Sequence, residues 1–299
     1  MTSKSWTIKD LLSVSIDFLK SKNIDSPRLC AEILLAHQLN TDRLKLYLDF
    51  DQPIGEKDLI RYRAMIKRLI ENEPVQYITG TQEFWSMDFI VNSSVLIPRA
   101  ETEILVEQAV RIYSEEYMDE SPDISVLDIG TGSGAIAIAM ALEIENANIC
   151  AADISEQALD TAKLNAAKHG MENRIYFFAG NLFEPFEKDH KHFDIILSNP
   201  PYVTSRDYDL LPKKIKDFEP RLALESGEDG LFHIREILDK APGFLTPGGW
   251  IILEMDPRQT DTAIRIISDN IEYTAGRIVK DYSNRDRVVI ARKKAVKNT

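Results

Sequence analysis

The amino-terminal part of the chain carries apolar side chains at the spacing of amphipathic helices. Three segments show this pattern, at residues 8–19, 26–39 and 56–71. Apolar residues three and four positions apart fall on one face of a helix, so each segment can bury one side. Thr7 and Asp10 form a candidate cap for the first helix. The pattern predicts a small helical bundle.

Beyond the bundle the pattern changes to short apolar runs, which are typical of buried strands. The runs lie at residues 125–129, 148–153, 193–198 and 250–254. Segments with helical character separate them, and a terminal hairpin ends at residues 287–291. Strands that alternate with helices are typical of an α/β fold with a parallel sheet. We therefore predict a doubly wound, mostly parallel, Rossmann-like sheet in addition to the helical bundle.

The joint between the two parts contains a strand-turn-strand pattern. Residues 84–91 and 95–97 flank the turn formers at residues 92–94. We expect a helical bundle over residues 1–75, a linker with a β-hairpin over 76–98, and an α/β domain over 99–299. The bundle either stabilises the chain or docks a large substrate, and its helical pattern is compatible with both roles.

Composition narrows the class of protein. The chain has 299 residues, of which 44% are hydrophobic, as is ordinary for a globular protein. No apolar run reaches the length of a membrane span, and residues 1–10 lack a signal-peptide core, so we expect a cytoplasmic protein without a membrane partner. Cys30 and Cys150 both lie in apolar segments, which predicts buried, reduced thiols. No histidine pattern predicts a metal site.

The charge bears on the choice of partner. The formal net charge is -12, and the one obvious basic stretch is near the carboxyl end, at residues 292–294. Proteins that wrap duplex DNA usually present a basic face that neutralises phosphates. We therefore expect no direct nucleic-acid partner, and the acidic excess suits a basic protein partner.

A glycine-rich turn follows the first predicted strand and runs into an Ala-rich helix. The turn contains Asp128, Gly130, Thr131, Gly132, Ser133 and Gly134. Glycines permit positive φ and close approach of a ligand, and free N–H groups at the helix start attract a negative group. Asp153 ends the next strand, where nucleotide-binding folds carry an acid for ribose hydroxyls. A ribose-bearing cofactor is expected, and with Ala135 as its last member the pattern also fits NAD.

Asn199, Pro200, Pro201 and Tyr202 follow the apolar run at residues 193–198. Open α/β sheets hold their active sites at such carboxyl ends of strands. Each proline fixes its own φ and keeps the preceding residue extended, so the carbonyls of Asn199 and Pro200 are stiffly held acceptors. With the aromatic face of Tyr202, this cluster can grip a planar group that carries an NH2, such as an amide or a nucleobase. A plain strand terminator is the alternative interpretation.

The order of the two motifs predicts that they meet. The stretch between them leaves room for two strand-and-helix units, which places Asn199 beside the first strand, across the switch point from Gly130. In this arrangement the chain resembles the class I methyltransferases that use S-adenosylmethionine and modify planar nitrogens. The resemblance implies that the glycine turn faces the methionine part of the cofactor, Asp153 the ribose, and residues 199–202 the acceptor nitrogen.

The resemblance narrows to the peptide-chain release factor glutamine methyltransferases. The stretches that carry it lie at residues 96–103, 128–134, 198–202, 219–231 and 284–289. The chain departs from the family pattern at Ala100, at residues 254–256 and at Asn181, and of these departures the one at Asn181 concerns the contact with adenine. The resemblance implies that Asn181, Leu182 and Asn199 join the glycine turn and Asp153 in holding S-adenosylmethionine.

For the reaction, the resemblance implies methyl transfer to the side-chain amide nitrogen of the glutamine in the Gly-Gly-Gln motif of release factors. Asn199, Pro200 and Tyr202 would act in catalysis and, with Pro201, would bind the substrate. The bundle would dock the release factor. Residues 203–222 have mixed charges and no clear periodicity, so we expect a mobile loop there over the acceptor pocket.

Three alternatives stay open. The Asn199 to Tyr202 cluster can also hold a flipped base, as an adenine-N6 or cytosine-N4 methyltransferase of DNA or RNA requires. A glutamine methyltransferase that acts on a ribosomal protein would share most of the motifs. A non-catalytic or NAD-binding Rossmann module would leave the Asn-Pro-Pro-Tyr turn without a purpose.

Overall fold

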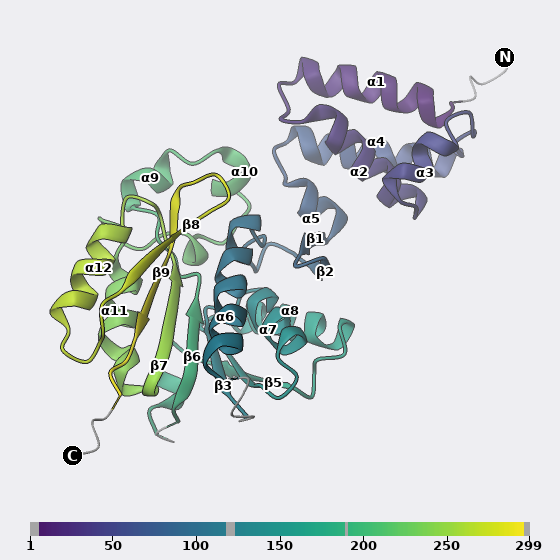
Figure 1. Ribbon diagram of the computed structural model, residues 1–299. Coiled ribbons are helices and arrows are strands. Elements are labelled where there is room, and N and C mark those ends of the chain that lie inside the picture. The colour runs from purple at the N-terminus through teal and green to yellow at the C-terminus, as the bar shows by residue number, and fades with distance from the viewer. Residues whose placement is uncertain (1–5, 118–122, 189–190, 296–299) are drawn as a thin grey trace, which may run out of the picture. The chain divides into compact units, whose positions relative to one another are not determined.

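The computed structural model describes residues 6–117, 123–188 and 191–295 and divides the chain into two compact units (Figure 1). One unit is Met1–Thr81 with Lys213–Phe218, and the other is Gln82–Pro212 with Glu219–Thr299. The first unit has a hydrophobic core of its own, and the second has two.

The first unit is helical, as predicted. Its amino-terminal segment contains the helices α1 (Ile8–Ser21), α2 (Pro27–Leu39), α3 (Arg43–Leu48), α4 (Glu56–Ile70) and α5 (Val75–Thr79), and its later segment contains α10 (Lys213–Lys216). The predicted cap is confirmed, because the Thr7 side chain accepts a hydrogen bond from the Asp10 backbone N–H at 3.2 Å. The sequence pattern missed α3 and α5, since helices of one or two turns are too short to show a helical period.

Among the described residues, the second unit is built on a seven-stranded sheet in the order β5-β4-β3-β6-β7-β9-β8. The strands are β3 (Ser125–Ile129), β4 (Asn148–Asp153), β5 (Ile175–Ala179), β6 (Phe193–Ser198), β7 (Leu245–Glu254), β8 (Arg277–Lys280) and β9 (Asp286–Arg292). Strands β3 to β7 pair in parallel, and β9 pairs antiparallel with both β7 and β8. The predicted mostly parallel sheet and terminal hairpin are confirmed.

Helices cover both faces of this sheet (Figure 1). Successive side chains of a strand point to opposite faces, so Val126 belongs to one core and Leu127 to the other. The first core contains residues of α6 (Glu103–Glu116), α7 (Ala135–Glu143) and α8 (Glu156–Lys168). The second contains residues of α11 (Phe232–Lys240) and α12 (Thr260–Asp269). Burial on both faces explains why the strands are apolar runs without alternation.

The hairpin at the joint lies earlier than the sequence predicted. Its strands are β1 (Thr81–Phe84) and β2 (Met87–Ile90), and no strand covers residues 91–97. Trp85 and Ser86 form the turn with φ of 52° and 57°. Two-residue turns in which both residues have a positive φ usually have the sequence Asn-Gly. Trp-Ser therefore did not indicate a turn, whereas the turn formers at residues 92–94 did.

The segment after Tyr202, where the sequence predicted a mobile loop, contains short helices that the lack of periodicity did not indicate. These are α9 (Ser205–Asp209), α10 (Lys213–Lys216) and the 3-10 turn η4 (Arg221–Ala223). Other 3-10 turns are η1 (Ala100–Thr102), η3 (Glu184–Phe186) and η5 (Ala241–Gly243). Within the described ranges, no helix combines the length and apolar character that crossing a membrane requires.

Candidate active site

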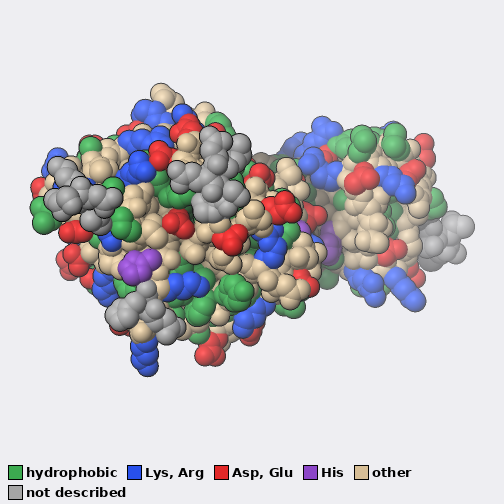
Figure 2. All heavy atoms as spheres, turned by 60° about the horizontal axis from the view of Figure 1, so that its bottom comes forward, with side chains coloured by type: hydrophobic (Ala, Val, Ile, Leu, Met, Phe, Trp, Pro, Cys, Tyr) green, Lys and Arg blue, Asp and Glu red, His purple; other side chains and the backbone are tan. Residues whose placement is uncertain are grey.

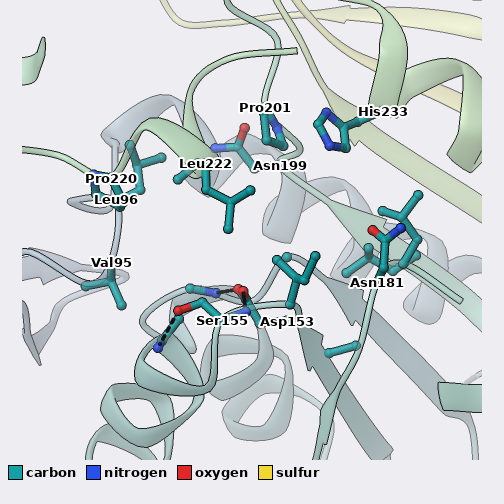
Figure 3. Close-up of a pocket in the computed structure, with 18 of the residues that line it drawn as sticks. Val95, Leu96, Asp153, Ser155, Asn181, Asn199, Pro201, Pro220, Leu222 and His233 are labelled. Atoms are coloured by element: carbon teal, nitrogen blue, oxygen red, sulfur yellow. Dashed lines mark hydrogen bonds between the residues drawn. The ribbon is translucent and has the colours of Figure 1, made fainter. Parts of the chain in front are cut away.

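A cavity lies at the carboxyl ends of β3, β4 and β6 (Figure 3). Its floor includes Asp153 and Ser155, and Asn199, Pro201 and Leu222 lie on the opposite side. Connections to helices leave β3 and β6 in opposite directions along the sheet order, so the cavity lies at a topological switch point. The Ser198 hydroxyl donates to the Ile129 carbonyl at 2.7 Å and joins the ends of these two strands.

The glycines of the turn after β3 serve two different purposes. Gly130 (φ 72°) and Gly132 (φ 54°) line the cavity, and a Cβ on Gly130 would meet nothing within 4 Å. A ligand can therefore approach the backbone closely at these positions. Gly134 (φ 81°) packs against α8 instead, because a Cβ there would lie 3.1 Å from the Ala162 side chain.

Asp153 connects the two turns that form the cavity floor. Its Oδ2 accepts from the Gly132 backbone N–H and its Oδ1 from that of Ser155, both at 2.9 Å (Figure 3). Burial raises the pKa of this carboxyl, and the backbone hydrogen bonds oppose that rise. Asp153 is half-buried and lines the cavity, so it can also meet hydroxyls of a ligand.

Asp128 lies beneath the turn. It is fully buried, and its Oδ2 accepts from the Thr131 hydroxyl at 2.7 Å and from the Ala137 backbone N–H at 3.2 Å. Burial raises the pKa of Asp128 to about 7. Among the described residues, the cavity wall does not include Asp128, Thr131, Ser133 or Gly134. The structure thus places these predicted residues where they hold the shape of the turn.

Asn199 lies on the side of the cavity opposite Asp153 (Figure 3). Its Nδ2 donates a hydrogen bond to Thr102 Oγ1 at 3.1 Å. Because that bond uses the NH2 end of the amide, the oxygen end remains as an acceptor. The amide orientation of Asn199 is therefore set from outside the cavity.

The other members of the Asn-Pro-Pro-Tyr turn are less exposed to the cavity. Pro201 lines it, whereas Pro200 is buried, and neither Pro200 nor Tyr202 is among the lining residues that the structure describes. Burial raises the pKa of the Tyr202 phenol above its usual range, and the nearby Glu254 carboxylate adds to the effect. The Tyr202 carbonyl accepts from Gln259 Nε2 at 2.9 Å, which fixes the backbone of the turn.

Asn181 and Leu182 both line the cavity, next to the end of β5. Leu182 has a φ of 52°, and the Asn181 backbone N–H donates to Glu184 Oε2 at 3.1 Å. The exposed Asn181 side chain lies on the same side of the cavity as His233 (Figure 3). The structure thus brings together Gly130, Gly132, Asp153, Asn181, Leu182, Asn199 and Pro201.

A further part of the wall contains Ser94, Leu96, Pro220, Leu222 and His233. The sequence placed Pro220 and Leu222 only in the expected loop over the acceptor pocket, and it assigned no role to Ser94, Leu96 or His233. The family resemblance covers Leu96, whereas Ser94 and His233 lie outside the stretches that carry it. Within the part of the chain that the structure describes, no group of three or more His, Cys, Asp or Glu side chains could hold a metal ion.

An ion pair connects the two segments of that wall. Arg99 Nη2 lies 2.6 Å and 2.8 Å from the two carboxylate oxygens of Glu219, whose side chain is only 2% exposed. The Ile97 backbone N–H also donates to Glu219 Oε2 at 3.4 Å. Pro220 and Leu222 follow directly, so this pair fixes their position over the cavity.

Comparisons with known proteins identify the family. A family model described as the PrmC N-terminal domain matches residues 10–80, and one described as the methyltransferase small domain matches residues 106–228. A release factor glutamine methyltransferase of Geobacter sulfurreducens is 41% identical over 90% of this chain and 91% of its own length. The chain belongs to the release factor glutamine methyltransferase family.

Other relatives agree with this family. A release factor glutamine methyltransferase of Rhodopirellula baltica is 38% identical over 96% of this chain and 97% of its own length. Among solved structures, a methyltransferase from Pyrococcus furiosus matches with a TM-score of 0.50 and 17% identity, over 77% of this chain and 98% of that one. That structure supports the fold alone, whereas the sequence relatives make this chain an enzyme of the glutamine methyltransferase class.

Proposed function

We propose that this enzyme transfers a methyl group from S-adenosylmethionine to the side-chain amide nitrogen of the glutamine in the Gly-Gly-Gln motif of release factors. The observation that carries the proposal is the Asn199 amide, whose NH2 end is bonded to Thr102 and whose oxygen end stays free to accept. Such an acceptor suits a substrate NH2 group. The names of the relatives support the choice of substrate.

The cavity fits S-adenosylmethionine. Gly130 and Gly132 leave open space where side chains would otherwise project, so the methionine part can lie against their backbone. Asp153 offers a carboxylate for the ribose hydroxyls, and Asn181 and Leu182 form the wall suited to adenine. When bound, the cofactor supplies an electrophilic methyl group on a sulfonium.

The residues of this chain position the acceptor. An amide nitrogen is a poor nucleophile because its lone pair is delocalised into the carbonyl. Hydrogen bonds from the substrate NH2 to Asn199 Oδ1 and to the Pro200 carbonyl would hold the nitrogen in line with the methyl group, with Tyr202 packed beside it. Positioning of this kind can supply at most about 7 to 11 kcal/mol of the barrier.

The proposed partner is a protein. The net charge is -12, and on the face shown in Figure 2 Lys and Arg side chains are interspersed with Asp and Glu side chains. This distribution suits a basic protein better than a nucleic-acid backbone. The helical unit is the proposed docking part. A release factor would meet the enzyme in the cytoplasm, where translation ends.

Methyl transfer from labelled S-adenosylmethionine tests the proposal. The acceptors are a release factor, the same factor with Gln→Ala in its Gly-Gly-Gln motif, ribosomal protein, and single- and double-stranded DNA. We expect label on the intact release factor alone, and label on DNA would overturn the assignment. Asn199→Ala should abolish turnover while binding of S-adenosylhomocysteine persists. Equal loss of turnover and binding would contradict the acceptor role of Asn199.

A further inference from the structure

His233 reaches the cavity from the first turn of α11. Its side chain is half-buried and lies on the same side of the cavity as Asn181 (Figure 3). Its Nδ1 lies 2.9 Å from the hydroxyl oxygen of Ser226, which is only 1% exposed. Among the described residues, the cavity wall includes His233 but not Ser226. The Nδ1 edge of the imidazole is therefore turned away from the cavity, and the edge that carries Nε2 is turned toward it.

The hydrogen bonds of Ser226 decide which nitrogen of this imidazole carries the proton. Ser226 Oγ accepts from the His233 backbone N–H at 3.1 Å, one of the free N–H groups in the first turn of α11. Among the described residues, its other hydrogen bond is with His233 Nδ1. A proton on Nδ1 would leave the buried hydroxyl proton of Ser226 without an acceptor, which costs free energy. The hydroxyl therefore donates to Nδ1, and the neutral imidazole carries its proton on Nε2.

The Nε2–H group is available to a ligand. Burial lowers the pKa of His233, against the opposing effect of the Glu236 charge, so the neutral form is favoured. Within the described part of the chain, the imidazole makes its hydrogen bond through Nδ1 alone. A half-buried donor on a cavity wall that has no protein partner suits an acceptor on the molecule that enters the cavity.

The wall around His233 fits a flat heterocycle. The apolar side chains of Ile154 and Leu182 line the same cavity, and Ile154 is 53% exposed. Asn181 is exposed there, and among the described residues it forms hydrogen bonds through its backbone, so its amide is available. Apolar surfaces suit the faces of an aromatic ring, whereas an amide and an imidazole N–H suit the nitrogens at its edge. Adenine has both features, and its ring nitrogens are acceptors.

We propose that His233 binds the adenine of the cofactor, with Nε2–H donating to one of the adenine ring nitrogens and Ser226 holding the proton on Nε2. This inference rests on the proposed use of S-adenosylmethionine. It gives the adenine a partner outside the stretches that carry the family resemblance. In this scheme His233 contacts the cofactor and takes no part in methyl transfer.

Calorimetry with S-adenosylhomocysteine tests the contact without turnover. His233→Phe keeps an aromatic ring and removes both nitrogens, and we expect the Kd to rise about fivefold to tenfold, as the loss of one hydrogen bond does. An unchanged Kd would overturn the proposal.

The matched control is His169→Phe. His169 is half-buried in the same unit, its ring centroid lies 5.2 Å from that of Phe89, and among the described residues it does not line the cavity. We expect this variant to bind S-adenosylhomocysteine with the wild-type Kd. A rise in Kd equal to that of His233→Phe would show that loss of any such histidine weakens binding, and would overturn the proposal.

Analogues of S-adenosylhomocysteine separate a hydrogen bond from general damage to the wall. In each analogue a carbon atom replaces one adenine ring nitrogen. For the nitrogen that His233 binds, the analogue should bind the wild-type enzyme about fivefold to tenfold more weakly than S-adenosylhomocysteine. His233→Phe should bind both ligands equally, because the bond is already absent. Equal losses in both proteins for every analogue would overturn the proposal.

The tautomer gives a readout on the enzyme without any substitution at the site. With isotope-labelled histidine, the ring signals of His233, identified by their loss in His233→Phe, should show a proton on Nε2 at neutral pH. S-adenosylhomocysteine should shift this Nε2–H signal, and Ser226→Ala should shift the Nδ1 signal. A proton on Nδ1, or an Nε2–H signal that ignores the ligand, would overturn the proposal.

The proposed function and this inference fail in different ways. If the wild-type enzyme binds S-adenosylhomocysteine but labels no release factor, the proposed acceptor is wrong, and calorimetry still decides the role of His233. If it labels the release factor and His233→Phe binds S-adenosylhomocysteine with the wild-type Kd, the inference alone is wrong.

Discussion

The carbonyl oxygen of Tyr202 occupies the space into which a side chain on residue 230 would project, because an ideal Cβ on Gly230 would lie 2.3 Å from it. The Gln259 side chain, which holds that carbonyl, would lie 2.4 Å away. Gly230 also has a φ of 72°, a left-handed conformation that favours glycine. This contact explains why the stretch around Gly230 accompanies the Asn-Pro-Pro-Tyr turn.

Gly230→Ala should therefore displace the turn. We expect a loss of about 2 to 5 kcal/mol in the free energy of unfolding, from backbone strain and overpacking, with a fall in kcat. The control is Gly170→Ala, since Gly170 has a φ of 70° with nothing within 4 Å of its Cβ position. The Gly170→Ala variant should lose only about 1 to 2 kcal/mol in the free energy of unfolding, and its kcat should stay at the wild-type value. Equal effects in denaturant melts and turnover assays would show that close approach to Tyr202 is unimportant.

Asp153→Asn should weaken cofactor binding. Its two oxygens accept from the Gly132 and Ser155 backbone N–H groups, and an asparagine would place an NH2 against one of these donors. The variant also loses the charged acceptor that we propose for the ribose hydroxyls, and a charge-assisted hydrogen bond of about 1.5 to 3 kcal/mol to the ligand raises the Kd for S-adenosylhomocysteine about tenfold or more. Calorimetry measures this change. The control is Asp160→Asn, on the exposed face of α8. If the two variants bind S-adenosylhomocysteine with the same Kd, Asp153 does not belong to the site.

Arg99→Ala should destabilise the second unit. It leaves the Glu219 carboxylate buried without its ion-pair partner, which costs about 3 to 5 kcal/mol. The double variant with Glu219→Leu should recover most of that loss, because the unpaired charge is removed. Arg111→Ala breaks a solvent-exposed pair with Glu115 and should leave the free energy of unfolding nearly unchanged. Urea unfolding measures all three, and similar losses in Arg99→Ala and Arg111→Ala would contradict the buried-pair argument.

Much of the fold could be predicted because its signals are local. The apolar runs of β3, β4 and β6 predicted their strands to the residue. The hairpin before residue 91 was misplaced because its turn depends on distant partners. The Trp85 backbone N–H donates to Glu103 Oε1 at 2.8 Å, and its indole donates to Glu143 Oε1 at 2.7 Å. Such contacts leave no pattern around the turn itself.

The candidate site also combines residues that local motifs predict with residues that only distant contacts bring together. Gly130, Gly132, Asp153 and Asn199 belong to short motifs at strand ends, so their meeting at one cavity followed from the topology. Arg99 and Glu219 are 120 residues apart, and Thr102 and Asn199 are 97 apart. No local spacing marks those pairs, and only the tertiary structure brings them together.

The stability of this protein should depend on pH through Glu254. Burial raises the pKa of Glu254 from 4.5 to about 7, against the opposing effects of the Thr102 hydrogen bond and the Arg287 charge. Between these values the folded state binds more protons than the unfolded state, so the free energy of unfolding falls as pH rises. This decrease in the free energy of unfolding is complete above pH 7 and amounts to about 1 to 3 kcal/mol.

Glu254→Gln removes this titration while keeping the side-chain size. We therefore expect the variant to gain stability relative to the wild type as pH rises from 4.5 to 7, with no further gain above pH 7. Urea unfolding across this pH range measures the difference between the two proteins in the free energy of unfolding. Groups that titrate in the same way in both proteins do not contribute to this difference. A constant difference would mean that Glu254 keeps the same charge throughout. A difference that shrinks with rising pH would mean that its charged form is the stabilised one, because Arg287 and Arg99 would then outweigh burial.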